Sequence, residues 1–263
     1  MTGTGDIRNV VREKYGEIAE QSAQGCGCGP GGCCGGSAVD QVAEYIGYTP
    51  EQLAALPEGA NLGLGCGNPL AHAAPKAGEV VLDLGSGAGM DAFLAAREVG
   101  PTGRVIGVDM TPQMLEKARA NAVAVGAANV EFRLGEIEHL PVADASVDLI
   151  ISNCVINLSP AKEQVFREAY RALRPGGRMV VSDLVLLKTL SEEVRGSVEA
   201  YVGCVAGAAL KEDYLDAIRA AGFRDVEVVE ERSYGDADLF GGAEWMREAA
   251  RSVVSAKVRA IKP

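Results

Sequence analysis

The sequence has little positive charge and almost no histidine. Its 263 residues include 25 Lys and Arg against 36 Asp and Glu, which gives a formal net charge of −11. Proteins that bind nucleic acid usually present a basic surface, so this balance argues against a nucleic-acid partner. The two histidines, His72 and His139, stand in an alanine-rich linker and beside a proline turn. We expect both on the surface and neither on a metal.

Long apolar runs are absent as well. No stretch approaches the ~20 residues that a membrane helix needs, and the sequence begins without the charged start and apolar run of a secretory signal. We therefore expect a cytoplasmic protein with no membrane partner. The cytoplasm keeps thiols reduced, so the odd number of cysteines, seven, indicates chemistry or metal binding before structural disulfides.

The cysteines form two sets. Four crowd a glycine tract between Gly25 and Gly36, and three stand far apart in turn-like or small-residue settings. The crowded set is Cys26, Cys28, Cys33 and Cys34, and the separate set is Cys66, Cys154 and Cys204. Neither set has the paired C-x2–4-C spacing of a tetrahedral zinc site, so we do not expect resident zinc.

Short apolar segments alternate with helical ones in the middle of the chain. The predicted strands are Val80–Leu84, Arg104–Val108, Val130–Leu134, Val147–Ser152 and Arg178–Leu187. Strands that alternate with helices favour a parallel sheet with helices on both faces. Farther along, we expect helices over Ser191–Ala209 and Lys211–Ala221, a late strand over Val226–Glu231 and a terminal helix over Trp245–Ile261.

A glycine loop, Asp83–Gly89, follows the first strand and opens a helix. Asp109 ends the second strand, at about the 20-residue distance expected of an acidic residue that accepts ribose hydroxyls, so the loop indicates a nucleoside. The loop reads G-x-G-x-G and not the G-x-G-x-x-G of pyrophosphate sites. Asp83 would repel a pyrophosphate but can accept a hydrogen bond from an ammonium. S-adenosylmethionine has an ammonium and no phosphate, and a tight turn without a ligand is the alternative.

The segment from Val80 to Asp109 and the turn Leu173–Gly177 resemble the class I S-adenosylmethionine-dependent methyltransferases. The resemblance implies an α/β, Rossmann-like fold with a mostly parallel seven-stranded sheet. It divides the chain into an N-terminal cysteine-bearing region (1–74), a cofactor-binding core (75–187) and a C-terminal substrate-site and cap region (188–263).

The resemblance also implies the contacts of the cofactor. The glycine loop would face its methionine part, Asp109 its ribose and Met110 its adenine, while residues after the third and fourth strands would flank the adenine and border the substrate. The implied contact residues are Asp83, Gly85, Gly87, Gly89, Asp109, Met110, Glu136, Ile137, Asn153 and Val155.

The three separate cysteines carry the substrate hypothesis. Cys154 follows the fourth strand, in a loop that lines the space beside the donor methyl in this fold. Core packing is the ordinary explanation for any one cysteine, because cysteine behaves as a small hydrophobe. Converging thiolates instead select a soft centre, such as trivalent arsenic, whose lone pair could be aimed at the methyl. Asn153–Asn157 offers no obvious aspartate or histidine base, which a hydroxyl or carbon acceptor usually requires.

Segments that include GANLGLGCGNP, SVDLIISNCVINLSP and YVGCVAGA closely resemble the arsenite S-adenosylmethionine methyltransferases, and the resemblance spans roughly Tyr15 to Phe223. It implies that Cys154 and Cys204 hold trivalent arsenic, supplied as arsenite or an arsenic–thiol conjugate. It further implies that Cys66 and one upstream cysteine complete the binding and form a disulfide as the product arsenic is reduced. S-adenosylhomocysteine would be released, and a thioredoxin-like protein or glutathione would reset the disulfide.

The upstream tract departs from that family, because the family pattern needs one cysteine there and this chain offers four. Cys34 fits the position best and Cys33 is second. Cys26 and Cys28 could be a metalloid-capture arm, a redox reserve or part of a flexible tether. Two other functions stay open. A carbon methyltransferase of the quinone-biosynthesis kind would share the glycine loop without needing the separate cysteines, and a metalloid-binding protein would show no turnover.

Overall fold

The computed structural model describes residues 4–21, 38–233 and 251–263. Its strands are β1 Val80–Leu84, β2 Arg104–Asp109, β3 Val130–Leu134, β4 Val147–Asn153, β5 Leu173–Leu186, β6 Arg224–Ser233 and β7 Val253–Ile261. Its helices are α1 Thr4–Gln21, α2 Ala38–Tyr45, α3 Pro50–Ala54, α4 Leu70–Ala73, α5 Met90–Val99, α6 Pro112–Ala124, α7 Lys162–Ala172, α8 Glu192–Gly196, α9 Val198–Val202 and α10 Lys211–Ala220, with a 3-10 turn, η1, at Ile156–Leu158.

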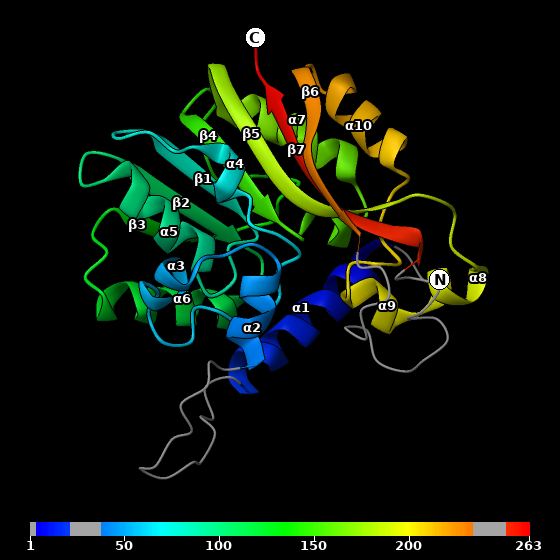
Figure 1. Ribbon diagram of the computed structural model, residues 1–263, viewed down its shortest axis with the longest axis horizontal. Coiled ribbons are helices and arrows are strands. Elements are labelled where there is room, and N and C mark those ends of the chain that lie inside the picture. The colour runs from blue at the N-terminus through cyan, green and yellow to red at the C-terminus, as the bar shows by residue number, and fades with distance from the viewer. Residues whose placement is uncertain (1–3, 22–37, 234–250) are drawn as a thin grey trace.

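Seven strands form one sheet in the order β3-β2-β1-β4-β5-β7-β6 (Figure 1). The strands β1 to β5 are parallel, and β7 runs antiparallel between β5 and β6. This confirms the predicted α/β fold with a mostly parallel seven-stranded sheet. The strand order reverses between β1 and β4, and open sheets of this kind bind ligands at that point, beyond the carboxyl ends of the strands.

The central strands are buried on both faces. Leu82 and Leu84 of β1 belong to the apolar layer that includes α7 and α10, whereas Val81 belongs to the layer that includes α4, α5 and α6. All three side chains are fully buried. Strands covered on both faces are expected to read as continuous apolar runs, which is why their positions were predictable.

The C-terminal segment differs from the prediction. Val253–Ile261 is the strand β7, so the terminal helix predicted over Trp245–Ile261 is wrong from Val253 on. Arg251 and Ser252 are helical, and residues 245–250 lie outside the described residues. Val254 and Val258 are four residues apart, a spacing that suits one face of a helix and one face of a strand equally. The pairing with β5 along the whole of β7 decides for the strand. The sheet therefore extends beyond residue 187.

The helix predicted over Ser191–Ala209 is replaced by two short ones, α8 and α9. Ser191 Oγ accepts a hydrogen bond from the Val194 N–H, and Ser197 Oγ accepts one from the Ala200 N–H. Each serine thus caps the start of a new helix, because its side chain satisfies a backbone donor that helix geometry leaves open. The other two C-terminal predictions are confirmed as α10 and β6.

Helix α1 lies across the end of the sheet toward which the parallel strands point, next to α9 (Figure 1). Arg8 Nη2 donates to Glu138 Oε1 at 2.9 Å, and the Tyr15 hydroxyl donates to the Val202 carbonyl at 3.3 Å. These bonds fasten α1 to the loop after β3 and to α9. Within the described ranges, no helix combines the length and the apolar character that crossing a membrane would take.

Candidate active site

The glycine loop turns sharply at the carboxyl end of β1. Gly85 has a φ of +66°, a left-handed conformation that glycine adopts without steric cost. A Cβ at this position would lie 2.4 Å from the Val155 side chain. Only glycine therefore allows the loop after β4 to approach the loop after β1 so closely.

Three carboxylates gather around this loop. Asp83 is 2% exposed, and its Oδ2 has no hydrogen-bond partner within the described part of the chain. Burial, and then the charges of Asp91 and Asp109, raise the pKa of Asp83 well above its ordinary value. Asp109 accepts hydrogen bonds from the Gly87 N–H at 3.0 Å and the Thr111 N–H at 2.8 Å. Burial nevertheless raises the pKa of Asp109.

These groups line an open pocket of about 1140 Å³, a volume that includes solvent at its mouth. Most of the predicted cofactor contacts are in its wall. They are Asp83, Gly85, Gly87, Asp109, Met110, Ile137, Asn153 and Val155.

The other two predicted contacts, Gly89 and Glu136, are not in the wall. A Cβ at Gly89 would lie 2.7 Å from the Phe93 ring, so this position packs against α5. Glu136 has a side chain 35% exposed, 3.5 Å from Arg12 Nη2 of α1. Glu138, two residues on, lines the pocket with a side chain only 5% exposed. The direction of side chains beyond a strand end is set by the loop and not by the strand period, so the sequence did not distinguish the two glutamates.

Two further polar residues of the pocket were missed from the sequence. The Tyr48 hydroxyl donates to Asp91 Oδ1 at 2.7 Å. Burial raises the pKa of Asp91 to about 6, against the lowering effect of the hydrogen bonds from Tyr48 and Asn153. Asp91 is the second residue of α5, in the first turn after the glycine loop, and that position was a usable signal. Tyr48 comes from a turn far upstream and gave none.

The pocket fits S-adenosylmethionine. The partnerless oxygen of buried Asp83 suits an ammonium, because a buried carboxylate needs a donor or a cation to offset its desolvation. Asp109 and the apolar side chains of Met110 and Ile137 also lie in the wall. A diphosphate would meet the carboxylates, while the wall's arginine, Arg8, is paired with Glu138.

The three separate cysteines meet beyond the ends of β4 and β5. Cys66, Cys154 and Cys204 are 5%, 7% and 3% exposed, and all three are reduced. Cys204 Sγ donates to the Cys154 carbonyl at 2.9 Å. Hydrogen bonds with the thiols of Cys204 and Cys66, followed by burial, raise the pKa of Cys154 well above its ordinary value. Cys154 is thus the middle sulfur of the three, and it is a neutral thiol at rest.

Two of these cysteines have strained backbones. Cys154 has a φ of 60° and Cys204 a φ of 63°. This left-handed conformation costs an L-residue with a side chain roughly 1–2 kcal/mol. Such strain persists where the surroundings impose it, and it clusters at functional sites. For Cys154 the restraint includes its N–H, which donates to the Ser182 carbonyl at 2.8 Å.

Cys66 is held against the ends of β4 and β5 between two glycines. A Cβ would lie 2.7 Å from Asn153 Nδ2 at Gly65 and 2.1 Å from Ser182 Oγ at Gly67. Asn153 Oδ1 accepts from the Cys66 N–H at 3.0 Å, and Asn153 Nδ2 donates to the Gly67 carbonyl at 2.7 Å. The sequence GLGCG therefore permits a contact that a larger residue beside Cys66 would block.

Asn153 joins the cysteines to the pocket. Its Nδ2 also lies 3.1 Å from Asp91 Oδ2 and 2.9 Å from the Tyr48 hydroxyl. Cys154, the next residue, lines the pocket as well. A methyl donor in the pocket would therefore lie beside an acceptor bound to the thiols, with Asn153 and Cys154 in contact with both. The predicted upstream residues Cys33 and Cys34 lie outside the described residues, as do Cys26 and Cys28.

Comparison with known proteins agrees with this geometry. The family model described as "Methyltransferase domain" matches residues 75–222. An arsenite methyltransferase of Halobacterium salinarum is 47% identical over 98% of this chain and 67% of its own length. An arsenite methyltransferase of Aquipseudomonas alcaligenes is 46% identical over 64% of this chain and 50% of its own length.

A crystal structure extends the comparison to the fold. CrArsM, an arsenic(III) S-adenosylmethionine methyltransferase from Chlamydomonas reinhardtii, superposes with a TM-score of 0.67 at 36% identity, over 88% of this chain and 75% of that chain. The chain spans about two thirds and one half of the lengths of the two relatives named above. The residues matched by the family model include the glycine loop, Cys154 and Cys204.

Proposed function

The chain belongs to the S-adenosylmethionine-dependent arsenite methyltransferases, and we propose that it transfers a methyl group to trivalent arsenic held by Cys66, Cys154 and Cys204. The observation that carries this proposal is the convergence of three buried thiols beside a cofactor-sized pocket, with Cys154 in the wall of that pocket. The thiols Cys66 and Cys204 come from the regions on either side of the 75–187 core.

S-adenosylmethionine, when bound, supplies an electrophilic methyl on a sulfonium. Asp83 would hold its ammonium and Asp109 its ribose, with the glycine loop along its methionine part. The chain's own task is then to place the acceptor, which makes proximity and orientation the main sources of rate. The strained backbones of Cys154 and Cys204 fix two sulfurs for that purpose. Apolar neighbours such as Val11 and Leu158 surround the thiols and exclude water.

Binding of arsenic needs no separate base. Each arsenite hydroxyl leaves as water with the proton of the thiol that replaces it, so three As–S bonds form and three waters are released. This balance suits cysteines that are neutral at rest, as the raised pKa of Cys154 requires. The arsenic lone pair then stays free to take the methyl.

Methylation oxidises the arsenic from trivalent to pentavalent, because its lone pair becomes the new bond. We propose that the Cys34 thiol then attacks the Cys66 sulfur. The Cys34–Cys66 disulfide forms, the As–S bond to Cys66 breaks and leaves its electron pair on arsenic, which becomes trivalent again, and the Cys34 proton passes to solvent. A thioredoxin-like protein or glutathione would reopen the disulfide by thiol exchange. A cytoplasmic location follows from the need to keep these thiols reduced.

Cysteine-to-serine replacement tests the proposal. In Cys66→Ser, Cys154→Ser and Cys204→Ser we expect arsenite methylation, followed as S-adenosylhomocysteine release, to fall at least tenfold each, with cofactor affinity retained. Cys26→Ser is the matched control for loss of a thiol. Wild-type methylation in all three variants would overturn the proposal and favour a carbon acceptor.

A further inference from the structure

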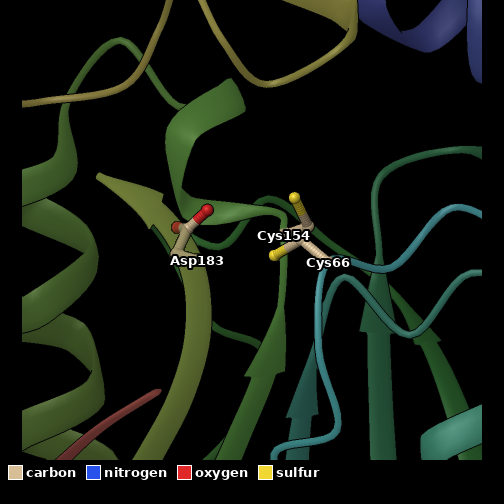
Figure 2. A group of neighbouring side chains, drawn as sticks. All are labelled: Cys66, Cys154 and Asp183. Atoms are coloured by element: carbon tan, nitrogen blue, oxygen red, sulfur yellow. The ribbon is translucent and has the colours of Figure 1, made fainter. Parts of the chain in front are cut away.

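A carboxylate lies next to two of the thiols. One ligand atom each from Cys66, Cys154 and Asp183 lie within 4.8 Å of one another, and all three residues are buried. Figure 2 shows them arriving from three segments, with the Cys66 sulfur directed toward Asp183. Cys204 Sγ lies outside this group. Asp183 has no part in the proposed binding of arsenic, which involves only the sulfurs.

Asp183 is fixed in place from several sides. It is 1% exposed, its Oδ1 accepts from Asn157 Nδ2 at 2.8 Å and from the Leu184 N–H at 3.0 Å, and its Oδ2 accepts from the Tyr214 hydroxyl at 3.2 Å. Asn157 is fully buried, and its own Oδ1 has no hydrogen-bond partner within the described residues. These hydrogen bonds hold the carboxylate in one orientation, and its distance from the two thiols is short enough for one cation to contact all three residues.

We propose that Cys66, Cys154 and Asp183 bind a thiophilic divalent cation, of the Zn²⁺ or Cd²⁺ kind, at a site that overlaps the arsenic site. Zinc accepts thiolate and carboxylate ligands together, with Zn–S bonds of about 2.3 Å and Zn–O bonds of about 2.0 Å. Movements of about half an ångström per ligand would close the observed triangle on one ion. Each thiol that binds releases its proton to solvent, and the ion offsets the resulting negative charge.

The overlap makes the cation an inhibitor of arsenic binding, a consequence that rests on the proposed function. Arsenic and the divalent cation differ in the third residue that binds them. Trivalent arsenic selects a third thiolate, which Cys204 supplies, whereas a divalent cation of borderline softness also accepts the carboxylate of Asp183. Loss of Cys204 should therefore weaken the binding of arsenic only, and loss of Asp183 the binding of the cation only. Cys66 and Cys154 bind both.

Binding titrations test this separation in the full-length chain with Cys26, Cys28, Cys33 and Cys34 changed to serine, so that the glycine tract cannot take up metal. The probes are Cd²⁺ and arsenite, each alone. Asp183→Asn is expected to weaken Cd²⁺ binding at least tenfold and arsenite binding less than twofold, and Cys204→Ser to do the reverse. Equal Cd²⁺ affinity with and without Asp183→Asn would overturn the proposal.

A second measurement does not depend on how Asp183→Asn folds. The ¹¹³Cd NMR shift of the Cd²⁺-loaded parent should correspond to a mixed sulfur and oxygen ligand set, and an all-sulfur shift would overturn the proposal. Steady-state methylation by the full native chain should show Cd²⁺ competing with arsenite. If arsenite methylation proves independent of Cys66 and Cys154 while Cd²⁺ still binds with a mixed shift, the proposed function fails and the cation site stands.

Discussion

The two halves of the site are built in different ways. In the cofactor half, Asp83, Gly85 and Asp109 lie at the ends of neighbouring parallel strands, where the register of β1 and β2 places them. In the thiol half, Cys66, Cys154 and Cys204 come from loops far apart in the chain and are positioned by long-range hydrogen bonds and strained backbones. The first half follows from the sheet, and the second depends on individual contacts. We therefore expect single substitutions to damage the thiol half most.

The largest effect should come from the middle sulfur. Cys154→Ser removes the thiol that lies between Cys66 and Cys204 and that also lines the cofactor pocket. We expect kcat/KM for arsenite to fall about a thousandfold, which corresponds to about 4 kcal/mol of lost transition-state stabilisation. Cofactor affinity, measured by calorimetry, should change less than threefold. A comparable loss of cofactor affinity would show that the two halves are not separable.

Asp183, the carboxylate next to the thiols, should make the free energy of unfolding depend on pH. Burial raises the pKa of Asp183 from 3.8 to about 7. The folded protein therefore keeps a proton that the unfolded chain releases, and stability is lost as the pH rises from about 4 to about 7. At 1.36 kcal/mol per pH unit the loss is at most about 4 kcal/mol. Urea unfolding at several pH values should show a steeper loss of stability in the wild type than in Asp183→Asn, in which the raised pKa values of Asp83, Asp91 and Asp109 leave a smaller dependence. Parallel curves for the two proteins would contradict the prediction.

Cofactor binding should be most sensitive to substitutions that block the close approach of the loops after β1 and β4. Gly85→Ala places a Cβ 2.4 Å from Val155 in a left-handed backbone. We expect cofactor affinity to fall about thirtyfold, or about 2 kcal/mol, with arsenite affinity nearly unchanged. Gly126→Ala is the matched control, because Gly126 has a φ of +64° with open space around the added Cβ. If both variants weaken cofactor binding equally, backbone strain and not the contact with Val155 is responsible.

The fold was largely predictable because its signals are local. Apolar runs of the central strands mark burial on both faces, and the alternation with helices fixes the parallel arrangement. β7 was missed because Val254 and Val258 match a helix period and a strand period at once, and only its pairing with β5 separates the two. The break between α8 and α9 depends on serine caps that the apolar pattern does not reveal.

For the candidate site, as for the fold, local signals could be read from the sequence and long-range contacts could not. Asp83 and Asp109, predicted as cofactor contacts, do line the pocket, because the strand order places the ends of β1 and β2 at its wall. Tyr48 was missed because its place in the pocket depends on how the segment before the sheet folds back onto α5, where it meets Asp91. Asp183 lies in an apolar strand, β5, and its nearness to the thiols is a long-range contact that no local pattern encodes.

The smallest predicted effect concerns the residue that the two halves share. Asn153 binds the Cys66 loop through the Cys66 N–H and the Gly67 carbonyl, and its Nδ2 also contacts Asp91 in the pocket. Asn153→Ala leaves all three thiols in the chain but frees the Cys66 loop. We expect arsenite affinity to fall about tenfold, since one hydrogen bond contributes roughly 1 kcal/mol and the loop must then be ordered on binding. Cofactor affinity should fall about threefold.

Asn129→Ala is the matched control for this variant. Asn129 also bridges backbone carbonyls, those of Ala96 and Gly100, on a loop at the opposite end of β3 from the pocket. It should lower stability without changing arsenite affinity. Arsenite and cofactor titrations of both variants decide whether Asn153 couples the halves. If Asn153→Ala weakens only cofactor binding, Cys66 is positioned by its flanking glycines and by the strand ends beneath it. Arsenic binding by the thiols would then not depend on Asn153.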